Sequence, residues 1–218
     1  TGVVEARLSD AKFFWDKDRS KNLIKQIVKL KDIKFYEGLG TIYDKTQRLR
    51  KLSGMVADEF NIKKENAEIA ASISKSDLCS DLVNEYPDLQ GLMGKYFAIS
   101  QGFEEDVSNA VSDHYLPLGN NSMPAKKPIS YTVAITDKID TLVGFFLINE
   151  KPTSSKDPFA LRRSAIGLLR TIIDNKLNLK LRNLISYNIK LFEEQGVKKI
   201  NENSENEILN FLKERMKN

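Results

Sequence analysis

Apolar residues recur every three or four positions through most of this 218-residue chain, which is the period of an amphipathic α-helix. No stretch of useful length alternates with the two-residue period of a half-buried strand. The pattern therefore predicts an all-α fold. It indicates helices over residues 18–31, 41–60, 67–86, 89–99, 104–115, 129–146 and 158–174, with two more between 177 and 216.

Glycine and proline residues separate these helices. Gly38 and Gly40 have neither a strand before them nor a Gly-Lys-Ser/Thr after them, so they predict a turn and a helix start rather than a phosphate loop. Pro87 ends the helix before it, because the residue preceding a proline disfavours helical geometry. Residues 116–127 form a loop that leads into the most apolar helix of the chain.

That apolar helix, 129–146, carries two carboxylates. Asp137 and Asp140 are three residues apart and therefore share a face. A buried carboxylate is costly unless it is paired, so both need cationic partners. The candidates are Lys75, Lys138 and the Arg162–Arg163 pair.

The helix that follows presents a basic stripe. Asp157 can cap it, with Pro158 at its first position, where the missing N–H does no harm. Arg163 and Arg170 lie opposite the apolar face, and Arg162 lies at its edge. Two interpretations stay open: a face that binds phosphates, or ion pairs with Asp137 and Asp140 inside the fold.

Charge is unevenly distributed, although the net charge is only +4. Residues 7–51 contain 13 Lys/Arg and 6 Asp/Glu, residues 77–113 contain one Lys and 8 Asp/Glu, and residues 126–170 contain 8 Lys/Arg and 4 Asp/Glu. The basic segments could attract the acidic one within the fold, or they could form a salt-sensitive surface for phosphates.

Several classes of protein are excluded or disfavoured. Cys79 is the single cysteine, which excludes an internal disulfide and a cysteine-based zinc site. No apolar run is long enough to cross a bilayer and no signal-peptide pattern opens the chain, so we expect a cytoplasmic protein with no membrane contact.

Several long motifs occur together in one order. They are Leu39–Arg48, Ser74–Tyr86, Leu89–Gly94, Asp113–Pro117, Ala-Ile-Thr-Asp-Lys-Ile-Asp-Thr-Leu-Val-Gly at 134–144 and Lys-Asp-Pro-Phe-Ala-Leu-Arg-Arg-Ser-Ala-Ile-Gly-Leu-Leu-Arg at 156–170. Together they resemble the beta subunit of bacterial glycyl-tRNA synthetase of the tetrameric type, over about residues 7–175. That subunit is much longer, so the resemblance implies a fragment.

The resemblance implies an HD-like helical domain over residues 1–175 and a helical extension over 176–218. Active HD-type phosphohydrolases hold a divalent metal with several histidines and aspartates, and the metal activates water. Here His114 is the only histidine, so no multi-histidine site can form within the chain. We expect a degenerate site or structural pairing, with no metal, among Lys75, Asp77, Asp137, Lys138 and Asp140. The alternative is a carboxylate site for magnesium and a divalent-metal-dependent HD-type phosphohydrolase.

The resemblance also implies a part in ATP-dependent glycylation of tRNA. The alpha subunit carries the aminoacylation site, so we expect no catalytic residue and no cofactor in this fragment, with ATP and Mg required by the whole enzyme. Implied partners are tRNA(Gly), the alpha subunit and the remainder of the beta subunit. We expect Lys156, Arg162, Arg163 and Arg170 to bind tRNA phosphates or to position the segment that does, because arginine binds phosphate oxygens in a bidentate manner. A third possibility is a structural module that docks the alpha subunit through the acidic segment 77–113.

Overall fold

The computed structural model describes residues 1–217 and is mostly helical. Its α-helices are α1 (Gly2–Asp18), α2 (Leu23–Gln26), α3 (Ile42–Phe60), α4 (Lys64–Ile73), α5 (Asp81–Glu85), α6 (Leu92–Ser100), α7 (Glu105–Asp113), α8 (Pro128–Leu147), α9 (Leu161–Asp174), α10 (Leu181–Glu194) and α11 (Ser204–Met216). Three short 3₁₀ helices are η1 (Ile27–Asp32), η2 (Ser76–Cys79) and η3 (Pro87–Leu89). Two short strands, β1 (Lys34–Tyr36) and β2 (Gly40–Thr41), form a small antiparallel sheet.

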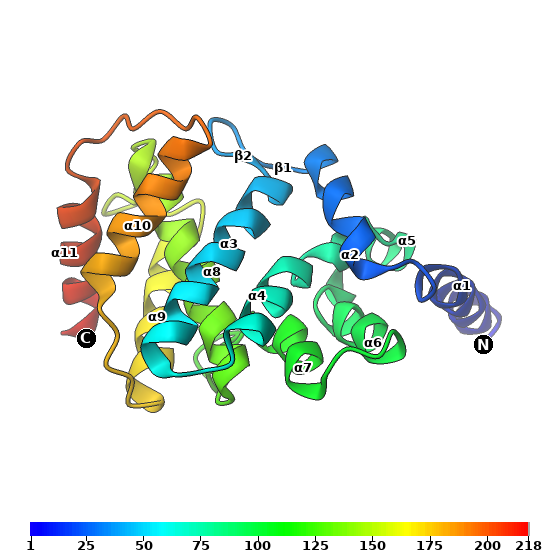
Figure 1. Ribbon diagram of the computed structural model, residues 1–218. Helices are drawn as coiled ribbons and strands as arrows, with labels where there is room; N and C mark the ends of the chain where they lie inside the picture. The colour runs from blue at the N-terminus through cyan, green and yellow to red at the C-terminus, as the bar shows by residue number, and fades with distance from the viewer. Residues whose placement is uncertain (218) are drawn as a thin grey trace.

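Helix α8 runs through the middle of the molecule, and α3, α7, α9, α10 and α11 surround it (Figure 1). It buries 15 of its 20 residues, which agrees with its apolar sequence. Its two halves belong to different apolar clusters. The first half packs with α4, α6 and α7, and the second half packs with α9, α10 and α11. Helix α3 contributes to both clusters, so α3 and α8 hold the two halves together.

The turn predicted at Gly38 and Gly40 is present. Both glycines have positive φ, +86° and +78°, a backbone conformation that favours glycine. Thr41 then begins α3 with a capping box, in which its hydroxyl accepts from the N–H of Asp44 and the Asp44 carboxylate accepts from the N–H of Thr41. The strands on either side of the turn are too short for their period to be visible in the sequence, and they are the exception to the all-α prediction.

Two predicted helices are interrupted by polar side chains. The helix predicted over 18–31 is wrong as a continuous element, because α1 ends at Asp18 and α2 begins only after Asn22, whose side chain accepts from two N–H groups of α2. The helix predicted over 67–86 breaks after Ile73, and Ser80 caps α5 by accepting from the N–H of Val83. In both places the capping side chain competes with the continuing helix for backbone hydrogen bonds.

The start of α9 also differs in detail from the prediction. Asp157 does cap it, since its carboxylate accepts from the N–H groups of Leu161 and Arg162, both at 2.9 Å. Ala160 has φ of +53°, however, so the helix begins at Leu161 and Pro158 lies before it. The capping residue Asp157 is therefore separated from the first residue of α9 by a short turn and does not stand directly before the helix.

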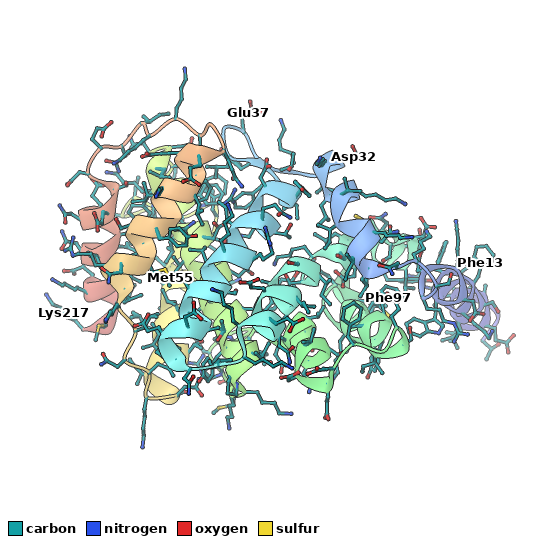
Figure 2. All side chains as sticks on the ribbon, viewed as in Figure 1. Phe13, Asp32, Glu37, Met55, Phe97 and Lys217 are labelled. Atoms are coloured by element: carbon teal, nitrogen blue, oxygen red, sulfur yellow. The ribbon has the colours of Figure 1, made fainter. Side chains whose placement is uncertain are left out.

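Helices α10 and α11 belong to the same apolar cluster as α9 and the second half of α8. Gly144 of α8 permits this packing, because a Cβ there would lie 3.0 Å from the ring of Phe192 on α10. Helix α1 projects from the opposite side of the molecule (Figure 1). Trp15 fixes its last turns by stacking on Phe97 of α6, with ring centroids 5.2 Å apart, whereas Phe13 on the same helix is exposed (Figure 2). The division of the chain at residue 175 stays a prediction.

Candidate functional site: a buried ionic centre and a basic groove

The two aspartates of α8 lie in a buried ionic centre. Asp137 Oδ2 is 3.0 Å from Lys75 Nζ, and its Oδ1 is 3.1 Å from Lys45 Nζ. Asp140 accepts two hydrogen bonds from the Arg48 guanidinium, at 2.7 and 2.9 Å, and a third from Lys45 at 3.0 Å. All the cations that pair with these carboxylates within residues 1–217 therefore come from α3 and from the residue just before η2.

Mutual attraction keeps these groups charged. Burial opposes the charge on Asp137, but the Lys75 and Lys45 ammonium groups outweigh it and hold its pKa well below the usual value. Burial likewise opposes the charge on Asp140, and Arg48 with Lys45 lowers its pKa. Burial opposes the charge on Lys75 too, yet Asp137 raises its pKa above the ordinary lysine value. The centre is thus a set of charged groups that are stable only together.

His114 belongs to this centre as a neutral side chain. It is fully buried, with Nδ1 2.7 Å from the carbonyl of Val111 and Nε2 3.0 Å from Lys75 Nζ. This arrangement fits the tautomer in which Nδ1–H donates to Val111 and Nε2 accepts from the ammonium. Burial, together with Lys75, lowers the pKa of His114 to about 3. Its acceptor nitrogen is already occupied, so it has no free lone pair for a metal or a substrate.

The donor set does not fit a divalent metal. Within residues 1–217, no three His, Cys, Asp or Glu side chains lie close enough to hold one. His114 Nε2 and Asp137 Oδ2 are 3.9 Å apart, and the Lys75 ammonium hydrogen bonds to both. A lysine therefore occupies the place between the two groups that are best suited to bind a cation. We derive no metal-dependent step from these residues.

Asp77 and Lys138 lie near the centre but serve the neighbouring backbone. Asp77 Oδ2 accepts from the N–H groups of Gly91 and Gly94, at 2.7 and 3.0 Å, and so fixes the start of α6; burial raises the pKa of this carboxyl. Lys138 Nζ donates to the carbonyls of His114 and Leu116. Burial lowers the pKa of Lys138 to about 8. The five residues predicted as a degenerate site therefore divide, with Lys75, Asp137 and Asp140 in the ionic centre and two beside it.

Sequence reasoning missed Lys45, Arg48 and two amides, Asn188 of α10 and Gln195 just after it. Asn188 donates to Asp140 at 2.9 Å, and Gln195 accepts from Arg48 at 2.7 Å. The Arg48 guanidinium also lies 3.8 Å from the ring centroid of Phe192. A usable signal was present, because Lys45 and Arg48 stand three residues apart next to the apolar positions of α3 and so share the buried face.

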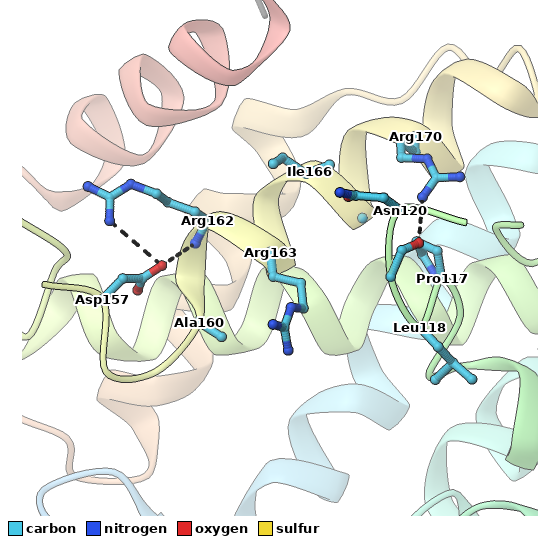
Figure 3. Close-up of a pocket in the computed structure, with 11 residues that line it drawn as sticks. Pro117, Leu118, Asn120, Asp157, Ala160, Arg162, Arg163, Ile166 and Arg170 are labelled. Carbon is cyan, nitrogen blue, oxygen red and sulfur yellow. Dashed lines mark hydrogen bonds and ion pairs between the residues drawn. The ribbon is translucent and has the colours of Figure 1, made fainter. Parts of the chain in front are cut away.

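A second charged region, the basic groove, lies on the surface beside α9 (Figure 3). It has a volume of about 520 Å³ and is lined by the loop after α7, the turn before α9 and one face of α9. The lining residues are Pro117, Leu118, Gly119, Asn120, Asp157, Ala160, Arg162, Arg163, Ile166, Gly167 and Arg170. The Lys138 side chain packs against Gly167. Its Cε lies 3.0 Å from the position that a Cβ at residue 167 would occupy.

Two of the groove arginines are engaged with the backbone. Arg170 donates to the carbonyls of Gly119 and Ser122, at 3.1 and 2.7 Å. Arg162 donates to the carbonyl of Thr153 and lies 3.8 Å from the Asp157 carboxylate. They hold the two loops that border the groove. Neither reaches Asp137 or Asp140, which pair with Lys45, Arg48 and Lys75 instead, so the internal pairing considered for the arginines of this helix is not formed.

The other two predicted cations are exposed. Within the described part of the chain, Arg163 makes no hydrogen bond or ion pair through its side chain, and Figure 3 shows it reaching into the groove between Ala160 and Leu118. Lys156 is exposed on the turn before α9 but does not line the groove. The structure therefore brings Arg162, Arg163 and Arg170 together in the groove lining and leaves Lys156 outside it.

The acidic segment 77–113 is only partly available to a partner. Asp77 is buried, and Asp81 is paired with Lys17 at 2.8 Å. Exposed acids remain at the start of α7, where Glu104 and Glu105 border a shallow hollow together with the half-buried Asp106. Among residues 1–217, every helix is too short or too polar to cross a membrane.

The fold and the two charged regions define a helical module with an internal ionic centre and a basic surface groove. The sequence profile of the glycyl-tRNA synthetase beta subunit matches residues 1–218, so the chain belongs to that family. Relatives named glycine–tRNA ligase beta subunit include those of Phenylobacterium zucineum (44% identical over 84% of this chain), Colwellia psychrerythraea (43% over 96%) and Clostridioides difficile (41% over 99%). The matched regions span 28%, 30% and 31% of these relatives, so the chain corresponds to about a third of their length.

Proposed function

We propose that this chain is a tRNA-holding part of a glycyl-tRNA synthetase beta subunit and has no catalytic site of its own. The observation that supports this most directly is the exposed Arg163 in a groove whose walls are held by Arg162 and Arg170. An arginine with no partner among residues 1–217 keeps its five N–H donors for a ligand, and phosphate oxygens match the geometry of that fork.

The four predicted cations take two roles in this proposal. Arg163 contacts a phosphate directly, and exposed Lys156 adds attraction along the same edge. Arg162 and Arg170 position the bordering loops, because their guanidinium groups already donate to Thr153, Gly119 and Ser122. This division makes Arg163 the sharpest single target for mutation.

The relatives suggest the setting of this activity. They are named as subunits of a glycine–tRNA ligase, and from that we propose that the whole enzyme charges tRNA(Gly) with glycine using ATP and Mg. The alpha subunit would supply the aminoacylation site, and the rest of the beta subunit would complete the assembly. The chain described here would contribute binding and orientation of the tRNA.

The test is binding of glycine tRNA to this chain across a salt series, with an unrelated tRNA as competitor. We expect affinity to fall steeply with salt, and Arg163→Ala to weaken binding and reduce the slope of log K against log salt by about one. The matched control is Arg50→Ala, which removes an exposed arginine of α3 outside the groove. Equal effects of the two substitutions would assign the binding to net charge rather than to the groove.

A scaffold role is the second candidate. It rests on the exposed acids at the start of α7, which could meet a basic surface of the alpha subunit. If the chain binds no tRNA at low salt, the direct-contact role is lost. Co-purification with the alpha subunit, abolished by the charge reversals Glu104→Lys and Glu105→Lys, would then support scaffolding.

A further inference from the structure

The basic groove continues into a second lobe on the other side of the loop after α7. This lobe has a volume of about 600 Å³ and is bordered by η3, the start of α6 and the end of α7. Pro117, Leu118 and Arg163 line both lobes, so the two form one continuous depression. Each lobe is within the size range of pockets that hold small ligands.

The ridge between the lobes is an apolar side chain on a braced loop. Leu118 is 72% exposed, although the loop that carries it is fixed at both ends. Lys138 donates to the carbonyl of Leu116 at 2.8 Å, and Arg170 donates to the carbonyls of Gly119 and Ser122. The fold therefore presents this leucine to solvent and prevents it from folding back onto the core.

The two lobes differ in chemistry. The α9 side carries the arginines, whereas the second lobe is bordered by Gln90, Ser112 and the carboxylates of Asp88 and Asp113, and by the half-exposed Leu92. A ligand that matches both lobes carries an anion close to an apolar surface with polar edges. A nucleotide meets this description, with its phosphate at Arg163 and its base against Leu118 and Pro117.

We propose that the two-lobed groove binds an unpaired nucleotide, and this inference rests on the proposed tRNA-holding function. Bases in an RNA duplex are stacked on one another, so they cannot place a face against Leu118, whereas an unpaired base has a free face that can pack against an apolar side chain. Arg163 lies where the lobes meet and binds the phosphate of the nucleotide, and Leu118 contacts its base. A substitution of Leu118 therefore distinguishes binding of an unpaired nucleotide from general attraction to phosphates.

The experiment is competition against labelled glycine tRNA by two RNAs that carry the same number of phosphates. One is a single-stranded oligoadenylate and the other is a blunt duplex. We expect the single strand to compete better, and Leu118→Ser to weaken its competition about fivefold or more while leaving that of the duplex unchanged. Ile200→Ser is the matched control, because Ile200 is 64% exposed and lies outside the groove.

The outcomes separate this inference from the function on which it rests. If Arg163→Ala weakens tRNA binding but the two RNAs compete equally and Leu118→Ser has no effect, the unpaired-nucleotide inference is overturned and tRNA holding stands. If the wild-type chain binds no tRNA at low salt, both fail. Thermal melting of each variant checks that it is folded, and Leu118 is exposed enough for this substitution to leave the fold intact.

Discussion

The ionic centre and the basic groove are built from the same kinds of side chain and behave in opposite ways. In the centre, Asp137 and Asp140 are surrounded by buried cations. In the groove, Arg162 and Arg170 donate hydrogen bonds to backbone carbonyls, and Arg163 faces solvent. Charged residues that look equivalent in the sequence are therefore structural where they are buried together and available for binding where one partner is missing.

The largest expected effect is in the centre. Asp140→Asn leaves Arg48 buried without its carboxylate, and breaking a buried ion pair from one side typically costs about 3–5 kcal/mol in the free energy of unfolding. Urea denaturation measures this loss. The control is Asp58→Asn, which breaks the exposed pair with Lys64 and should cost at most about 1 kcal/mol. A loss of similar size in both variants would contradict the assignment of Asp140 to a structural centre.

The next effect depends on pH through His114. The folded chain keeps this imidazole neutral down to a pKa of about 3, whereas the unfolded chain protonates it near 6.5. The unfolded state therefore binds more protons between these values, and stability falls as the pH drops through this window. Between pH 6.5 and 5 we expect a loss of about 1.6 kcal/mol, with a slope that approaches about 1.4 kcal/mol per pH unit at the lower end. Urea midpoints should show that His114→Gln removes most of this slope, and an unchanged slope would place the titrating group elsewhere.

The smallest effects are in the groove. Arg170→Ala removes two hydrogen bonds to the loop carbonyls and should reduce the free energy of unfolding by about 1–2 kcal/mol. Arg163→Ala should change it by less than about 0.5 kcal/mol, because the side chain is exposed and unpaired within residues 1–217. Thermal melting compares the two. If Arg163→Ala proved the more damaging, its proposed role as a free ligand would be untenable.

Periodicity predicted most helices because each one buries a continuous apolar stripe. It failed where a polar side chain redirects the backbone, as Asn22 and Ser80 do by capping the next helix. Such caps are local hydrogen bonds, and the apolar pattern can continue across them unchanged.

The candidate site was predictable only in part. The apolar surroundings of Asp137 and Asp140 showed that both needed cations, and Lys75 was among the candidates, but Lys45 and Arg48 were not. Lys45 and Arg48 lie more than ninety residues away in sequence from Asp140, and only the packing of α3 against α8 brings them together. The groove shows the same limit, since neighbouring Arg162 and Arg163 differ in whether a backbone carbonyl lies within reach.

The stacking of Trp15 on Phe97 has a practical consequence. Trp15 is the only tryptophan of the chain, and it lies in the last turns of the projecting helix α1. Its fluorescence therefore reports the attachment of that one helix, whereas the far-ultraviolet circular dichroism reports the helices of the whole molecule. Recording both signals during one denaturation would show whether α1 detaches before the body of the molecule unfolds.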